Sequence, residues 1–269
     1  MGRTDTDEKK KKTPHRGRRK KKRSILSNVI LIIAVAVFLV SAFQLIRIAK
    51  GYLDGRSEYE KVQDLALEDG EPEGGFRVDF DELKKINADT IGWIRFYPEP
   101  AIINYPLVQG KDNDQYLHQT FSANENTLGA IFLNVSNNAD FSDRNSIIYG
   151  HRMKDGSMFR HLEDYKDQEF WKANPYFYIY TPDGRELTYH IYSVATVEDT
   201  SDVYLTEFAS DNDYQAFLNM TKEASYYDTG VEVGVDDTVV TLSTCTKESD
   251  NHRLVVLGVK EKDVKLKEK

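Results

Sequence analysis

The sequence predicts a mostly β domain, a β-barrel decorated with helices, behind one N-terminal transmembrane helix. A single uncharged apolar run near the N-terminus has the length of a membrane span. Beyond residue 76 the apolar segments are short, closely spaced and rich in β-branched and aromatic residues, with turn residues between them. They do not alternate with helices as βαβ units would, and no internal repeat is present, so a barrel is favoured over a doubly wound sheet.

The predicted membrane anchor covers residues 24–46, which carry no charge and are bracketed by Arg23 and Arg47. At ~1.5 Å per residue, a helix of this length spans a hydrocarbon core of ~30 Å. The basic tail at residues 1–23 holds twelve Lys or Arg against three Asp or Glu, and such clusters stay in the cytoplasm. We therefore expect a single-pass protein of the cell membrane, with its N-terminus cytoplasmic and its C-terminal domain extracellular. A signal peptide cleaved near residues 40–42 is the alternative, but the apolar run exceeds a typical signal-peptide core.

Charge also limits the partners. The whole chain has a net charge of −8, so the part that follows the basic tail carries −17. Nucleic-acid binding needs a basic face that neutralises phosphates, and we expect no nucleic-acid partner. The many acidic residues are expected to be a solvated surface, with no metal site and no cofactor.

The region between the anchor and the domain is polar. Residues 47–75 end in an acidic, glycine-rich break at 69–75 and are expected to be an extracellular linker, partly helical at 58–67. The globular domain then covers residues 76–269. A short helix is expected at its start, over residues 79–87.

Strands are expected wherever apolar, β-branched or aromatic runs are bounded by Gly, Pro, Asn or Asp. Pro98 and Pro100 separate the first two runs, and Pro182-Asp183-Gly184 is a strong turn signal that joins two later runs into a hairpin. The expected strands are residues 91–96, 101–108, 129–134, 146–150, 176–180, 186–197, 238–245 and 253–260.

Two further helices are expected within the domain. Residues 155–174 show helical spacing with mixed charge. Residues 211–226 form an amphipathic pattern. Its apolar side consists of Tyr214, Phe217, Leu218 and Thr221.

The chain contains a single cysteine, Cys245, which closes the predicted strand at 238–245. An exported chain with one cysteine forms no internal disulfide and exposes a free thiol to oxidation. A thiol kept under these conditions is useful mainly as a nucleophile. A buried, inert cysteine is the alternative.

Arg253 begins the strand that follows, with seven residues between it and Cys245. If the two strands pair as a hairpin, both residues lie at the same end of the sheet. A guanidinium there would lower the thiol pKa from ~8.5 and could hold a developing oxyanion. The alternative is a salt bridge at the barrel rim with Asp250 or another acid.

A cysteine nucleophile also needs a proton donor and acceptor, and His151 is the best-placed histidine. It directly follows the apolar strand and glycine at 147–150, a position that is rigid yet open to a cleft. A purely structural histidine is the alternative. The other histidines lie in the tail, in polar helical stretches, within a strand or beside Arg253; they are His15, His118, His161, His190 and His252.

These motifs together resemble a known family. The run Thr241-Leu242-Ser243-Thr244-Cys245, followed by Arg253, resembles the T-L-x-T-C…R signature of sortases, and Tyr149-Gly150-His151 matches their histidine motif. The resemblance covers residues 76–261, and segments 89–94, 105–110 and 112–117 are similar to class B. The Asp-Pro-aromatic element of class C lids is not found in the sequence.

The resemblance implies an eight-stranded β-barrel and the activity of a membrane-anchored transpeptidase from a Gram-positive organism. In such an enzyme Cys245 would attack the Thr-Gly or Thr-Asn bond of a C-terminal sorting signal on a surface protein, with His151 as proton donor and Arg253 as oxyanion or substrate ligand. The acyl group would then pass to an amine of a peptidoglycan precursor or pilin. By motif match or strand alternation, the expected substrate contacts are Asn113, Leu117, Tyr204, Leu205 and Ser243.

Other classes fit the sequence less well. A papain-like peptidase would need its cysteine near the mature N-terminus and its histidine downstream, the reverse of the order here. An extracellular cysteine peptidase that uses water as acceptor stays open, as does a membrane-tethered binding module with an inert thiol.

Overall fold

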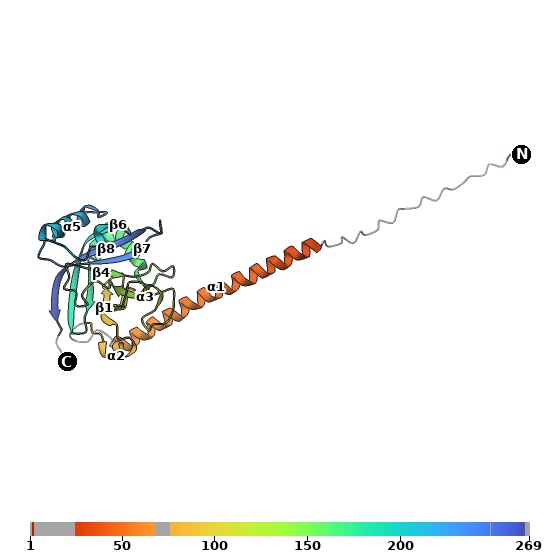
Figure 1. The fold of residues 1–269 in the computed structure, drawn as a ribbon, viewed down its shortest axis with the longest axis horizontal. Coiled ribbons are helices and arrows are strands. Elements are labelled where there is room, and N and C mark those ends of the chain that lie inside the picture. Colours follow the sequence, from red (N-terminus) through yellow and green to blue (C-terminus); the bar gives the residue numbers. More distant parts are fainter. Residues whose placement is uncertain (1, 3–24, 68–75, 248, 267–269) are drawn as a thin grey trace. The chain divides into compact units, whose positions relative to one another are not determined.

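The computed structural model describes residues 2, 25–67, 76–247 and 249–266 (Figure 1). The chain divides into two compact units, residues 1–47 and 48–269. Apart from Gly2, the basic tail at 1–23 lies outside the described residues, as does the acidic break at 69–75.

The first helix, α1, covers Ile25–Ala66. Among the described residues it is the one helix long and apolar enough to cross a membrane, with a mean hydropathy of 2.9 in its most apolar 18-residue window. Large apolar side chains on this part of α1 are exposed, as lipid-facing residues would be. The predicted anchor therefore coincides with a helix of suitable length and composition.

The predicted barrel is confirmed. Eight strands close in the order β1-β2-β3-β4-β7-β8-β6-β5, with β1 paired to β5. Neighbours are antiparallel except for β2 with β3 and β4 with β7, which are parallel. The strands are β1 Thr90–Phe96, β2 Asn104–Val108, β3 Ile131–Leu133, β4 Asn145–Tyr149, β5 Tyr176–Tyr180, β6 Arg185–Glu198, β7 Val239–Cys245 and β8 His252–Lys265.

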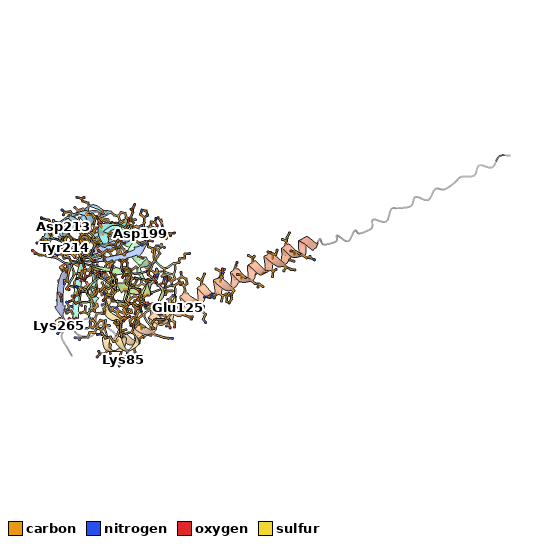
Figure 2. The ribbon with its side chains drawn as sticks, viewed as in Figure 1. Lys85, Glu125, Asp199, Asp213, Tyr214 and Lys265 are labelled. Carbon is orange, nitrogen blue, oxygen red and sulfur yellow. The ribbon has the colours of Figure 1, made fainter. Side chains whose placement is uncertain are left out.

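Short helices decorate the barrel (Figure 1). The last of them, α5 (Asp211–Glu223), is capped by the Ser210 side chain and buries the predicted apolar side, including Tyr214, which Figure 2 labels. The others are α2 Phe80–Ile86, α3 Gln115–His118, the 3₁₀ helices η1 Phe159–Lys166 and η2 Asp202–Tyr204, and α4 Gln168–Ala173.

The prediction of one continuous helix over 155–174 was wrong. The structure has η1 and α4 there, separated by Asp167 in extended backbone, with φ −91° and ψ 119°. The Asp167 carboxylate accepts from the Glu169 amide at 2.9 Å, so it caps a new helix where the pattern suggested a continuous one. Met158, with φ +56°, precedes η1 and delays the helical start.

The second half of α1 contributes to the core of the domain. Tyr59, Val62 and Ala66 lie three and four residues apart, on one face of the helix, and are buried in the same cluster as the barrel residues Trp93 and Leu107. The sequence pattern placed these α1 residues within a linker at 47–75. Their burial shows that part of this segment packs as domain structure.

Gly258 provides a test of how tightly the barrel is packed. A Cβ at this β8 position would lie 2.5 Å from the Phe177 ring and 2.9 Å from Tyr189 Cβ, and these two rings stack at 5.0 Å. We predict that Gly258→Ala lowers the free energy of unfolding by about 1–3 kcal/mol, because the rings must shift. Gly234→Ala is the matched control, since its nearest neighbour is 3.9 Å away. Equal unfolding midpoints for the two variants in denaturant titrations would contradict the prediction, because they would show that the core accommodates the added methyl group without cost.

Candidate active site

Three strand ends form the candidate site. The parallel strands β4 and β7 place Tyr149 opposite Ser243, and the Gly150 amide donates to the Ser243 carbonyl at 3.1 Å. His151 and Cys245 each come two residues after this aligned pair, so they leave the sheet at the same end. In the antiparallel pair of β7 and β8, Cys245 is the direct partner of Arg253. The structure thus brings the three predicted catalytic residues to one edge of the barrel.

Cys245 is a free and exposed thiol at the last position of β7. The residues just before it are held firmly, since Ser243 and Thr244 are each 2% exposed. The backbone of the cysteine is therefore fixed by the sheet while its side chain is open to a ligand. This exposure argues against the alternative of a buried, inert cysteine.

His151 is oriented by a backbone carbonyl. Its Nε2 lies 2.8 Å from the Leu117 carbonyl oxygen, and because a carbonyl can only accept, the proton of a neutral imidazole is on Nε2. Nδ1 is then the nitrogen available for proton exchange with a substrate. Sequence analysis could not find this partner, because a main-chain carbonyl has no residue-type signal.

Gly129 lies directly against this histidine. A Cβ there would be 2.9 Å from His151 Cδ2 and 2.6 Å from the Tyr116 carbonyl, and the φ of Gly129 is +61°. Both the left-handed backbone and the close approach require glycine. The loop that carries Gly129 therefore packs directly against one side of the His151 ring.

Arg253 is held by the β7–β8 turn. Its Nη1 donates to the Asp250 carbonyl at 2.6 Å and to the His252 carbonyl at 3.0 Å. Its Nη2 lies 3.6 Å from the carboxylate of Asp199, which Figure 2 labels. The contact with Asp250 is thus to the backbone, and the acidic partner is Asp199, a residue that the sequence analysis did not identify. These contacts fix the guanidinium at the start of β8, where the Arg253 backbone is paired with Cys245.

A cluster of aromatic rings and hydroxyl groups lies beside the ends of β4 and β7. The Tyr204 and Ser243 hydroxyls are 2.9 Å apart, and the Tyr204 ring stacks on Tyr149 at 6.3 Å. Burial raises the pKa of Tyr204 to about 12, so its hydroxyl stays protonated and can donate at neutral pH. Two of the predicted substrate contacts, Tyr204 and Ser243, are therefore neighbours on this side of the site.

The other predicted contacts have structural partners as well. Leu117 supplies the carbonyl that His151 binds. The Leu205 side chain is 45% exposed, while its carbonyl accepts from the Asn145 amide group at 2.8 Å. Asn113 accepts from the Val135 amide at 2.9 Å and so anchors the segment after β3. Of these three, Leu205 is the one that presents a large apolar side chain to solvent.

A charged cluster connects the segments that follow His151 and Cys245. Glu163 on η1 accepts two hydrogen bonds from Arg152, at 2.7 and 3.1 Å, and also pairs with Arg160. Lys247 lies 3.9 Å away. The Arg152 and Glu163 side chains are only 9% and 15% exposed. Burial opposes ionisation of Glu163, yet the bonds and charge of Arg152, with the charges of Arg160 and Lys247, hold its pKa below the ordinary value.

Comparisons with known proteins agree with this geometry. The sortase domain family matches residues 99–261. The chain belongs to the sortase family. Sortase B of Listeria monocytogenes is 38% identical over 189 residues, which cover 69% of this chain and 75% of that protein. The structure of sortase B from B. anthracis in complex with AAEK1 matches with a TM-score of 0.69 and 35% identity, over 79% of this chain and 99% of that one. A Staphylococcus aureus sortase B–substrate complex matches with a TM-score of 0.67 and 31% identity, over 79% and 97%.

This sortase is a cysteine transpeptidase or peptidase whose relatives are class B enzymes. The family assignment confirms the resemblance that the histidine, cysteine and arginine motifs suggested. Among the described residues, no group of three or more His, Cys, Asp and Glu is arranged to bind a metal ion.

Glu163 gives a prediction for stability against pH. Its pKa is lowered in the folded state, so its contribution is present above the unfolded value of ~4.3 and is lost as pH falls through the folded value. We predict that Glu163→Gln costs about 2 kcal/mol at pH 7, because two charge-assisted bonds are weakened. In thermal denaturation, the difference in Tm between Glu163→Gln and the unsubstituted protein should shrink as the pH is lowered from 7 to 3.

The matched control is Glu169→Gln, whose ion pair with Lys172 is exposed. Such a pair contributes about 0–1 kcal/mol. If Glu163→Gln were no more destabilising than this control at pH 7, or if its deficit persisted at low pH, the ion pair would not be the source of the stability.

Proposed function

We propose that this sortase is a membrane-anchored transpeptidase that cleaves the C-terminal sorting signal of surface proteins at a Thr-Gly or Thr-Asn bond. The acyl group is then joined to an amine of a cell-wall precursor or a pilin. The observation that carries this proposal is the meeting of an exposed thiol, an oriented imidazole and an anchored guanidinium at the ends of β4, β7 and β8. The Staphylococcus aureus relative is a sortase B–substrate complex, which supports a bound substrate for this site.

In the proposed acylation step, Cys245 as thiolate attacks the carbonyl carbon of the threonine. The carbonyl oxygen becomes a tetrahedral oxyanion, which the Arg253 guanidinium stabilises with its fixed donors. His151 as imidazolium then gives its proton to the departing amine, and the carbon–nitrogen bond breaks. A thioester on Cys245 and a free amine are the products of this half-reaction.

The second half-reaction reverses these roles. The neutral His151 takes a proton from the incoming amine, which attacks the thioester and releases the Cys245 thiolate. A bound amine beside the thioester has a high effective concentration compared with undirected water, so ligation exceeds hydrolysis. No cofactor enters any of these steps, since the atoms and protons balance between substrate, thiol and imidazole.

The proposed groove for the sorting signal lies along the cluster of Tyr204, Leu205 and Ser243. The exposed Leu205 side chain offers an apolar contact and the Tyr204 hydroxyl a hydrogen bond, while the buried Ser243 hydroxyl bonds that of Tyr204 and orients it. On the other side of His151 we place Leu117 and Asn113, from α3 and the turn before it.

The proposed location follows from the apolar helix and the charge pattern. Residues 24–46 anchor the protein in the cell membrane as a single span, and the basic residues of 1–23 stay in the cytoplasm. The acidic domain is then extracellular, beside its wall or pilin acceptor. Protease added to intact protoplasts should digest the domain and spare the tail.

Variants of the three catalytic residues test the mechanism. Cys245→Ala should abolish thioester formation and cleavage. His151→Ala should slow an amide substrate more than a thioester of the same acyl peptide, because a thiolate leaving group needs no proton. Arg253→Lys keeps the charge but loses the planar fork, and we predict a loss of kcat of about 10²–10³-fold.

The measurement is mass spectrometry of the products that the full-length protein forms from Leu-Pro-type and Asn-Pro-type sorting peptides with glycine-type and diamino-acid nucleophiles. His252→Ala is the matched control, because it removes a histidine that lies next to Arg253 in the sequence but has no proposed role in proton transfer. Substantial turnover by Cys245→Ala, or an equal loss in His151→Ala and His252→Ala, would reject the mechanism. Hydrolysis alone with every amine would replace the transpeptidase with a cysteine peptidase.

A further inference from the structure

The second half of α1 contacts the loop that joins α3 to β3, residues 119–130. Glu125, which Figure 2 labels, lies within this loop. The central contact is Tyr59, whose hydroxyl donates to the Gly129 carbonyl at 2.8 Å and accepts from the Phe121 amide at 3.2 Å. The side chain is 4% exposed. One hydroxyl therefore bonds both ends of the loop, where no water can replace it without cost.

Two more contacts secure the same loop to the helix. The Glu58 carboxylate accepts from the Ser122 amide at 2.9 Å and from the Asn124 side chain at 3.0 Å. The Asn126 side chain donates to the Gly51 carbonyl at 2.9 Å. Hydrogen bonds to a charged group are among the stronger ones, so the helix holds the loop along much of its length.

The other side of this loop supports His151. Gly129 is the residue that bonds Tyr59, and it also lies against the His151 ring and the Leu117 carbonyl, which a Cβ would approach to 2.9 and 3.0 Å. The next residue, Ala130, donates to the Tyr116 carbonyl at 2.9 Å. A chain of direct contacts thus runs from Tyr59 through Gly129 to the imidazole.

We propose that Gly51–Tyr59 of α1 is a positioning element for His151 and that the Tyr59 hydroxyl is its main group. The proposal rests on the proposed role of His151 as proton donor. Tyr59 does not contact a reacting atom. It holds in place the loop residue Gly129, against which the imidazole packs. Without the hydroxyl, Gly129 and the Leu117 carbonyl lose part of their restraint, and the imidazole is aimed less well at the leaving amine.

The test is Tyr59→Phe in the full-length protein, which removes one oxygen and keeps the ring that packs edge-on against Tyr105 at 5.4 Å. The substrates are a peptide amide and a thioester of the same acyl peptide. We predict that kcat/KM for the amide falls about tenfold, while that for the thioester falls less than about twofold, because the thioester needs no proton from His151.

Tyr214→Phe is the matched control. The Tyr214 side chain is buried, and its hydroxyl also bonds two backbone groups, the carbonyls of Arg144 and Asp237, at 2.8 and 3.0 Å. It packs, however, in a hydrophobic cluster separate from the one that contains Tyr59. We expect Tyr214→Phe to lower Tm about as much as Tyr59→Phe does, but to leave the ratio of kcat/KM for the amide to that for the thioester unchanged. Glu58→Ala, at the helix surface, should move that ratio in the same direction as Tyr59→Phe.

His151→Ala in the same assay separates the two claims. If His151→Ala lowers the amide-to-thioester ratio but Tyr59→Phe and Glu58→Ala leave it unchanged, the positioning role is overturned and the proposed function stands. If His151→Ala does not change the ratio, the proposed role of the histidine fails. A lower ratio in His151→Ala, Tyr59→Phe and Glu58→Ala, with an unchanged ratio in Tyr214→Phe, confirms the inference.

Discussion

The parallel pairing of β4 with β7 is the constraint on which the site depends. These strands are far apart in the sequence, yet their register places Tyr149 beside Ser243. Since parallel strands leave a sheet at the same end, Cys245, the last residue of β7, and His151, two residues beyond the end of β4, must emerge together. The antiparallel return of β8 then adds Arg253 as the direct partner of Cys245. The geometry of the candidate site is a consequence of strand register, and a slip of one residue would turn each side chain to the other face.

The surroundings of the site convert this proximity into orientation. Backbone carbonyls hold both polar side chains: Leu117 binds the imidazole, and Asp250 and His252 bind the guanidinium. Main-chain partners move only when a whole loop moves, so the loop anchors set the accuracy of the site. Glu163 connects the segments after the histidine and the cysteine, while the second half of α1 secures the loop behind the histidine.

The sequence was most informative where residue type and backbone position carry the chemistry. Strand ends, glycine and a lone cysteine predicted the barrel edge, and the motifs at His151, Cys245 and Arg253 pointed to the family. It was least informative where the partner is a carbonyl or a residue distant in the chain, as with Leu117, Asp199 and Tyr59. The helical pattern at 155–174 was misread, because the Asp167 side chain caps a new helix within an otherwise continuous helical period. The burial of Tyr59 was missed because the charged residues around it are typical of a solvated linker.

The central claim, that β4 and β7 deliver residues 151 and 245 to one place, can be measured by cross-linking. His151→Cys leaves Cys245 as the only other thiol in the chain, and a disulfide forms only when the two Cα atoms come within about 7 Å. The control is His190→Cys on β6, which pairs with Val259, itself the partner of Val239 at the far end of β7. After mild oxidation, peptide mass spectrometry should find the 151–245 disulfide within single chains and none for the control. An absent link while both thiols react with a labelling reagent, or an equal yield in the control, would contradict the register on which the account depends.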